Sequence, residues 1–280
     1  MRVAIALCVA GLAIASPVAG DELVLPIFAI NWPGKDGNVW SSEVFLVNPG
    51  PATATVSNPH FVPGTLREPN PCYPPIAAFH EVAPYSTVML SSADLSIELQ
   101  CPENALGGLA FDADPPVVIT SRVANVRGGA ATGAALAGLG QDLPAFGPAD
   151  ISVPGAIYQL PALVFDSFRC ARAPLFEVYL YFANPGSSPA GVTLQRSHDS
   201  AAGELILDGA PQATPFTFTL PAQGWRQIKV DLGGASPSGC GSPQVADLFF
   251  TATGGVAVVA SVVDRTSQDA RTVLPVRTAD

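Results

Sequence analysis

Four consecutive residues carry the chemical groups of a serine hydrolase. Ser197, His198, Asp199 and Ser200 place hydroxyl, imidazole and carboxylate groups next to one another. A catalytic triad is assembled from side chains on different elements of a fold, and neighbours in a turn rarely reach its geometry. We therefore interpret this segment as a turn. Because the sequence also lacks a GxSxG, HExxH or glycine-rich phosphate-loop string, we assign no catalytic residue and expect a protein that is not an enzyme.

Acidic residues offer two further kinds of chemistry. Glu43 and Glu177 each begin a Glu-Val-aromatic-Leu string, and they would form a glycosidase carboxylate pair if the fold brought them together. They belong to different halves of the chain, so we interpret each as part of a solvated strand face. Asp112 and Asp114 could offer oxygen ligands to calcium. Two carboxylates are few for a shell of about 6 to 8 oxygens, and an Asx turn explains them better, so we expect no metal or other cofactor.

Tryptophan marks a candidate binding loop. The loop consists of Asn31, Trp32, Lys35 and Asp36. Trp32 precedes a Gly-Lys-Asp-Gly hairpin tip, where an aromatic ring has little core to join, and exposed loops often carry recognition. Trp40 and Trp225 each begin a strand-like run, and we expect them to plug the ends of a sandwich rather than to stack on a sugar ring.

The N-terminus has the pattern of an export signal. Arg2 precedes an apolar run, and small residues stand before Asp21, so residues 1–20 are predicted to be a removed signal peptide. A lipoprotein reading of Cys8 and a membrane anchor remain alternatives, but the apolar run is shorter than the roughly 20 residues that span a bilayer. We expect no membrane span after removal of the signal and a periplasmic or extracellular protein.

Composition favours a turn-rich β protein. Charged residues make up 13% of the chain, which also contains 26 Gly and 28 Pro, and these proportions argue against helical bundles and coiled coils. The formal net charge of -10 has the wrong sign for a chain that neutralises phosphates, so we expect no nucleic-acid partner.

The sequence contains one pattern written twice. A string from Glu43 to an Asn-Pro-Gly turn at Asn48 returns from Glu177 to Asn184, with two more residues between Leu and Asn in the second copy. The offset of about 135 to 140 residues matches a whole domain rather than a solenoid unit. We predict two tandem immunoglobulin-like antiparallel β-sandwich domains, residues 21–148 and 149–280, in an all-β chain.

Strands are predicted between the turn signals of each copy. In the first copy they are residues 23–30, 40–47, 52–57, 76–82, 87–90, 108–112 and 117–125, with an edge segment near 141–146. In the second copy they are residues 157–165, 176–182, 191–197, 204–207, 215–220, 225–231, 247–251 and 256–264. The best helix candidate, residues 130–139, is weakened by its glycines.

Four cysteines follow the signal, as expected for an exported chain. They are Cys72, Cys101, Cys170 and Cys240. Four thiols allow three pairings. The repeat favours Cys72 with Cys101 and Cys170 with Cys240, one bridge in each half. Zinc is a poorer explanation, because no two cysteines have a CxxC spacing and the histidines His60, His80 and His198 are isolated in the sequence.

These motifs resemble a known kind of module. The motifs that carry the resemblance are an opening Leu-Pro strand (Leu25, Leu160), a Gly/Trp hairpin ending at Trp40, the Asn-Pro-Gly turn and a closing Ser-Arg-Val-x-Asn strand (Ser121 to Asn125). The chain looks like uncharacterised immunoglobulin-like repeat modules of secreted bacterial surface proteins. The resemblance implies extracellular spacers or interaction domains and transfers no catalytic residue.

The expected function is therefore a structural, adhesive or protein-binding role at the bacterial cell surface or in the periplasm, with a protein or carbohydrate partner. Two alternatives remain open. One is a periplasmic chaperone for surface subunits, although its basic cleft is poorly matched by a chain with two lysines, Lys35 and Lys229. The other is a hydrolase on a β scaffold, because a fold does not fix a function.

Overall fold

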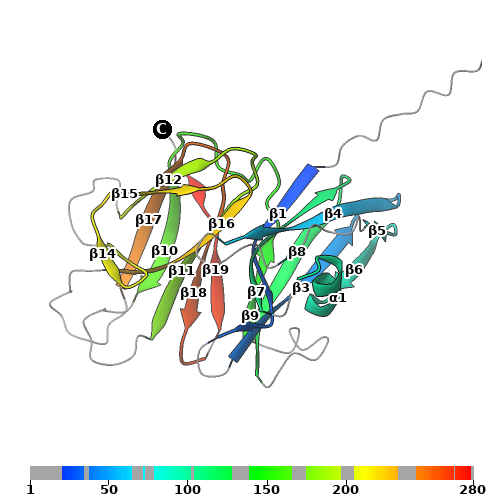
Figure 1. Ribbon diagram of the computed structural model, residues 1–280, viewed down its shortest axis with the longest axis horizontal. Coiled ribbons are helices and arrows are strands. Elements are labelled where there is room, and N and C mark those ends of the chain that lie inside the picture. The colour runs from blue at the N-terminus through cyan, green and yellow to red at the C-terminus, as the bar shows by residue number, and fades with distance from the viewer. Residues whose placement is uncertain are drawn as a thin grey trace, which may run out of the picture.

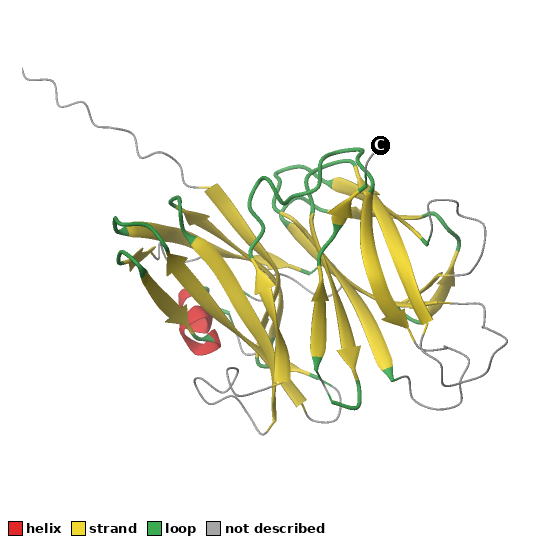
Figure 2. Cartoon of the chain, turned by 180° about the vertical axis from the view of Figure 1, so that it is seen from behind, coloured by secondary structure: helices red, strands yellow, loops and turns green. Residues whose placement is uncertain are grey.

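The protein is all-β, with several antiparallel sheets and one short helix among the described residues. The computed structural model describes residues 21–34, 38–64, 72, 79–101, 104–127, 139–165, 175–196, 205–232, 244–267 and 269–278. We call residues 21–148 the first half and residues 149–280 the second half. Figures 1 and 2 show the strands of the two halves as two groups lying side by side.

The first half contains two antiparallel sheets. In spatial order, one sheet consists of β1 (Asp21–Ile30), β7 (Ala105–Ala113), β4 (Ala54–Pro63) and β5 (Phe79–Val82). The other consists of β2 (Trp32–Pro33), β3 (Asn38–Asn48), β8 (Val118–Arg127) and β9 (Leu139–Pro144), with β6 (Ser86–Leu90) also paired to β3. Each predicted strand of this half has an observed counterpart, including β9 at the expected edge segment.

The second half also contains two antiparallel sheets. One sheet consists of β15 (Phe216–Leu220), β12 (Ala190–Gln195), β17 (Gln244–Ala252), β10 (Tyr158–Phe165) and β20 (Val276–Arg277). The other consists of β14 (Ala210–Gln212), β13 (Leu205–Leu207), β16 (Gly224–Leu232), β11 (Phe176–Asn184), β18 (Ala257–Asp264) and β19 (Ala270–Val273).

The strands of the two halves pair in the same order. The run β1-β7-β4-β5 of the first half corresponds to β10-β17-β12-β15 of the second. In the other sheet of the first half, β3 pairs with β6 and β8, and β8 pairs with β9. In the second half β11 pairs with β16 and β18, and β18 pairs with β19, in the same arrangement. The second half adds β13, β14 and β20 to this common pattern.

The Asn-Pro-Gly turns share three side-chain hydrogen bonds in both halves. The side-chain amide of Asn48 donates to the main-chain oxygens of Ala52 and Val82, and its oxygen accepts from the N–H of Gly50. The amide of Asn184 donates in the same way to Ser188 and Pro221, and its oxygen accepts from the N–H of Gly186. Both asparagines are buried. Each therefore ties its own turn to the turn before the strand paired with it, and this role explains why Asn stands before Pro-Gly in both halves.

The helix is an element that the sequence interpretation missed. Helix α1 (Ser92–Glu98) begins after Ser91, whose hydroxyl accepts from the N–H of Asp94 while the Asp94 carboxylate accepts from the N–H of Ser91. This reciprocal pair is a capping box, and the Ser-x-x-Asp spacing was the available signal. Figure 1 shows α1 on the side of the first half that faces away from the second. The predicted helix at residues 130–139 lies almost wholly outside the described residues.

One predicted disulfide is confirmed. Cys72 and Cys101 are joined, with Cα atoms 4.0 Å apart, and both are buried in the core of the first half. The bond is consistent with an oxidising, exported compartment. Cys170 and Cys240 lie outside the described residues, as does the predicted signal peptide at residues 1–20. Among the described residues, no helix has the length and apolar character needed to cross a membrane.

Three apolar clusters hold the strands together. One lies between the two sheets of the first half and includes Leu25, Phe28 and Phe111. A second lies between the two sheets of the second half. A third contains residues of both halves, among them Val24 and Trp225, and it draws on both sheets of the first half and on the sheet of β16, β11 and β18 in the second.

Candidate ligand-binding pocket between the two halves

The contact between the halves arises from strand alternation. Along β11, Val178, Leu180 and Phe182 point into the core of the second half. Alternate side chains of a strand point to opposite faces, so Tyr181 and Ala183 face the first half instead. On the opposing strand β1, Val24 and Ile27 face the second half, and the register shift between Leu25 and Phe28 lets two residues three positions apart share this face. We call this contact surface the junction.

Trp225 is the central anchor of the junction. Its side chain is 5% exposed, and its indole N–H donates to the main-chain oxygen of Pro26 at 2.6 Å. The ring lies 6.0 Å from that of Tyr181, and a Cβ added to Gly64 would lie 3.1 Å from the indole. The expectation that Trp225 plugs the end of a sandwich is therefore wrong, because the outer face of its sheet is covered by the first half.

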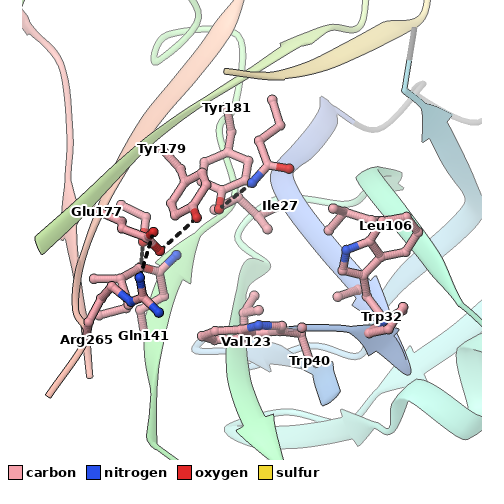
Figure 3. A pocket seen from close by; sticks show the side chains of 17 residues that line it. Ile27, Trp32, Trp40, Leu106, Val123, Gln141, Glu177, Tyr179, Tyr181 and Arg265 are labelled. Atoms are coloured by element: carbon pink, nitrogen blue, oxygen red, sulfur yellow. Dashed lines mark hydrogen bonds and ion pairs between the residues drawn. The ribbon is translucent and has the colours of Figure 1, made fainter. Parts of the chain in front are cut away.

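A pocket of about 390 Å³ opens at one end of the junction. Both halves contribute to it (Figure 3). Its walls include Trp32 and Trp40 from the first half and Tyr179 and Tyr181 from the second. The polar side chains that line it are Gln141, Glu177, Gln227, Ser261 and Arg265. Its volume lies within the range of roughly 300 to 1,000 Å³ that small-ligand pockets occupy. We call it the junction pocket.

Glu177 is the carboxylate of the junction pocket. Its Oε1 lies 2.8 Å from Lys229 Nζ and 3.4 Å from Arg265 Nη1, and its Oε2 accepts from the Tyr179 hydroxyl at 3.0 Å. Burial alone would raise the pKa of Glu177. The hydrogen bonds from Lys229 and Tyr179 and the two positive charges outweigh that effect and hold the pKa below its ordinary value. Glu177 is therefore ionised and engaged by three groups.

The two tyrosines are hydrogen-bond donors and acceptors at any physiological pH. Burial, followed by the charge of Glu177, raises the pKa of Tyr179 far above its ordinary value. Burial also raises the pKa of Tyr181, whose hydroxyl accepts from Gln227 Nε2 at 3.4 Å. Their rings lie 6.5 Å apart.

Gln141 brings a buried amide to the side of the pocket that carries Glu177 and Arg265 (Figure 3). Its Oε1 accepts from the Ser261 hydroxyl at 2.7 Å, which links β9 to β18 across the junction. Gln141 is 6% exposed, and its Nε2 donors have no partner among the described residues. The indole N–H of Trp40 likewise has no partner within the described part of the chain. These donors can bind a ligand that enters the junction pocket.

The candidate binding loop is partly described. Trp32 lines the junction pocket, and Figure 3 shows it across the space from Glu177 and Tyr179. The hairpin expected here is present, with Trp32 paired to Trp40 and Pro33 to Val39. Asn31 lies beside the pocket wall, where its Oδ1 accepts from the Ser41 hydroxyl at 3.2 Å. Lys35 and Asp36 lie outside the described residues. Trp40 lines the pocket as well, and it packs against the apolar cluster that contains residues of both halves.

Strand pairing corrects the proposed equivalence of Glu43 and Glu177. Trp40 pairs with Asn125, and Phe176 pairs with Asp264, which stands where Asn125 stands in the repeat. Counting from these pairs, the counterpart of Glu177 is Ser41, and no two-residue insertion separates the copies. Glu43 is also 2% exposed, so it does not belong to a solvated face. It lies opposite Arg122 and away from the junction pocket.

The other sequence candidates are dispersed. Asp112 accepts from Asn58 Nδ2 at 2.7 Å, whereas Asp114 accepts from the N–H of Thr55 at 3.0 Å. Within the described ranges no group of three or more His, Cys, Asp or Glu residues could hold a metal ion.

Two of the three histidines have acidic neighbours. His60 lies 3.5 Å from Glu22, and His80 lies 3.1 Å from Glu98. His198 and the whole Ser197 to Ser200 segment lie outside the described residues. Neither His60 nor His80 lines the junction pocket.

Sequence reasoning missed most of the residues that form the junction pocket. They are Gln141, Tyr179, Tyr181, Gln227, Ser261 and Arg265. A signal was present in the Glu-Val-Tyr-Leu-Tyr-Phe string, whose alternation places Glu177, Tyr179 and Tyr181 on one face. No comparable signal identifies Gln141, because its role depends on which strand of the other half lies opposite.

Comparison with known proteins gives no relative. No protein-family model, no curated protein and no solved structure matches this chain.

Proposed function

We propose that this protein is an exported pair of immunoglobulin-like β-sandwich modules that binds a ligand in the junction pocket without transforming it. The observation that carries the proposal is the junction pocket itself, with aromatic rings and convergent polar groups contributed by both halves. Small-molecule sites combine these features and occur preferentially where two modules meet. The matching pairing orders and the twin Asn-Pro-Gly hydrogen bonds support a duplicated module.

The polar groups of the junction pocket support binding rather than hydrolysis. General acid and base catalysis needs titratable groups whose pKa values are set apart and placed near neutrality. Glu177 is the only Asp or Glu among the described lining residues, and its pKa is lowered by Lys229 and Arg265. A carboxylate held ionised in this way is suited to orienting side chains and ligand.

A chaperone role is less well supported by the same contacts. Such a protein would use cations between its two modules to hold the terminal carboxylate of a subunit. Lys229 and Arg265 do lie there, but Glu177 already occupies both at 2.8 and 3.4 Å. A subunit carboxylate would have to displace this internal partner.

A fragment screen of the secreted chain tests the binding site without assuming a ligand class. Chemical-shift changes on adding a library of small polar and aromatic fragments are expected to cluster at the junction pocket. In Ala270→Trp, an indole placed on a lining residue should fill the pocket and abolish those changes. The matched variant Ala210→Trp, on the exposed strand β14, should preserve them. Hits that cluster elsewhere, or that survive Ala270→Trp, would reject the proposed site.

Two further measurements test the remaining parts of the proposal. N-terminal sequencing of protein from the culture medium or periplasm should begin at Asp21, and a retained leader would contradict export with signal removal. Assays with ester, glycoside and peptide substrates should show no turnover that is lost in Glu177→Gln, and such a turnover would make the protein an enzyme.

A further inference from the structure

The junction pocket has an aromatic wall suited to the face of a sugar ring. Trp32 and Trp40 lie directly opposite each other in the β2–β3 pair, and both side chains are half-buried. In Figure 3 their rings border the same space as Tyr179 and Tyr181. Aromatic side chains bury large areas while losing little conformational freedom. The C–H face of a pyranose ring is flat and apolar, and it can cover such a ring surface.

The opposite side of the pocket offers both donors and acceptors. Gln141 retains free Nε2 donors among the described residues, and Gln227 uses only its Nε2 there, so its Oε1 can accept a bond. The Tyr181 hydroxyl accepts from Gln227 and can still donate its own proton. A sugar hydroxyl both donates and accepts, so neighbouring hydroxyls can satisfy this mixed set. A proline-rich peptide offers mainly carbonyl acceptors and would leave the pocket acceptors unpaired.

The charges around the pocket are already balanced. Lys229 and Arg265 engage Glu177, and Asp231 lies close enough to both Lys229 and Glu177 to interact with them electrostatically. The group therefore contains two basic and two acidic side chains. An ionic ligand would have to break one of the existing pairs, and a buried charge left without its partner is costly. An uncharged ligand avoids this cost.

We propose that the junction pocket binds a short neutral saccharide, with one pyranose ring stacked on the Trp32 and Trp40 wall and its hydroxyls hydrogen-bonded to Gln141, Gln227 and Tyr181. This proposal rests on the proposed binding function and names its ligand class. The pocket volume of about 390 Å³ favours a short segment or chain end over a long polymer track.

Intrinsic tryptophan fluorescence is a direct readout, because all 3 tryptophans of the chain lie at the junction. The secreted chain would be titrated with maltotriose, cellotriose, xylotriose, mannotriose and tri-N-acetylchitotriose. Trigalacturonate would be titrated as an acidic saccharide and a decaproline peptide as a peptide ligand, to test the two competing ligand classes. At least one neutral trisaccharide is expected to give a saturable change in fluorescence, and decaproline none.

Variants then locate the bound sugar. Trp40→Phe and Gln141→Leu should each weaken binding about tenfold or more, because each removes a stacking surface or a donor from the pocket. Gln195→Leu, on a partly exposed residue of β12 outside the pocket, should leave the affinity within about twofold. Calorimetry of thermal unfolding verifies that each variant is folded, and Trp32→Ala provides a second test of the wall if Trp40→Phe is destabilised.

The outcomes separate the ligand class from the binding function. No saturable response to any neutral trisaccharide, a response to trigalacturonate or decaproline alone, or saccharide binding unchanged in both Trp40→Phe and Gln141→Leu would overturn the saccharide proposal. If fragments still bind at the junction pocket in those cases, the proposed function survives with another ligand class. If fragments also fail to bind there, both proposals are wrong.

Discussion

The indole N–H of Trp225 donates a hydrogen bond to the main-chain oxygen of Pro26, at 2.6 Å and across a sequence separation of 199 residues. Pro26 has no N–H of its own, and it lies where the pairing of β1 with β7 shifts register. A bulge in the first half thus presents an acceptor to an aromatic side chain of the second. This bond and the surrounding apolar cluster fix the two walls of the junction pocket relative to each other.

Substitution of Trp225 should loosen the junction. Trp225→Phe removes the donor and leaves the Pro26 oxygen buried without a partner, so we expect a loss of about 1 to 3 kcal/mol in the free energy of unfolding. Trp225→Ala adds a cavity and should cost about 3 to 5 kcal/mol. Urea unfolding measures both changes, and small-angle X-ray scattering should show a larger radius of gyration for Trp225→Ala.

Tyr85→Phe is the matched control, because Tyr85 is 74% exposed. Its unfolding free energy should stay within about 0.5 kcal/mol of the wild type. Equal stability of Trp225→Phe and Tyr85→Phe would show that the Pro26 bond contributes nothing to the junction.

The two turn asparagines should behave alike. Asn48→Ala leaves three main-chain oxygens without their donor and Asn184→Ala leaves two, so each should destabilise the protein by about 2 to 4 kcal/mol in urea unfolding. Gln195→Ala provides a control, with an expected change below about 0.5 kcal/mol. A large effect in one copy and none in the other would contradict the equivalence of the two turns.

The stabilisation by Glu177 should depend on pH in a defined direction. Its folded-state pKa lies below the ordinary 4.5, so the ionised form stabilises the fold above that pH. The contribution is lost as pH falls through the lowered pKa of the folded state. The stability difference between wild type and Glu177→Gln should therefore be about 1 to 3 kcal/mol at neutral pH and should shrink below about pH 4.5.

Denaturant unfolding at a series of pH values measures this difference. Glu81→Gln, at an exposed position of β5, should show a difference near zero throughout. If the stability difference between wild type and Glu177→Gln instead increases as the pH falls, the Lys229 and Arg265 contacts do not set the charge of Glu177.

The Cys72–Cys101 disulfide should stabilise the first half. It closes a loop with a sequence separation of 29 residues, so replacing both cysteines by Ala should reduce the free energy of unfolding by about 3 to 4 kcal/mol. Peptide mapping of the unreduced wild-type protein should recover the Cys72–Cys101 pair. The same map tests the predicted Cys170–Cys240 pair, and a bridge between the halves would contradict it.

The strands were predictable because their signals are local. The Asn-Pro-Gly turns at Asn48 and Asn184 stop one strand and begin another through backbone preferences that do not depend on distant residues. Helix α1 was missed although its capping box was visible, because seven residues are too few to show an apolar period. The equivalence of Glu43 with Glu177 failed because similar strings were aligned by residue type rather than by pairing register.

The junction pocket was not predictable in the same way. Its residues lie on outer sheet faces, and alternation alone assigns such faces to solvent. The sequence signal for a covered outer face was that apolar and polar residues do not alternate along β1 and β18. Both strands contain runs of consecutive residues that are buried on both faces. Those runs indicate that something covers the outer face, but not that the other half does so. Trp225 and Gln141 therefore became interpretable only from the structure.

Diffraction from crystals of the protein grown with the tightest-binding trisaccharide tests the central claim most directly. The account predicts a sugar ring between the Trp32 and Trp40 wall and the Gln141 amide, with the Glu177–Lys229 contact intact. A saccharide bound anywhere else on the protein, with the space between those side chains filled only by water, would contradict it.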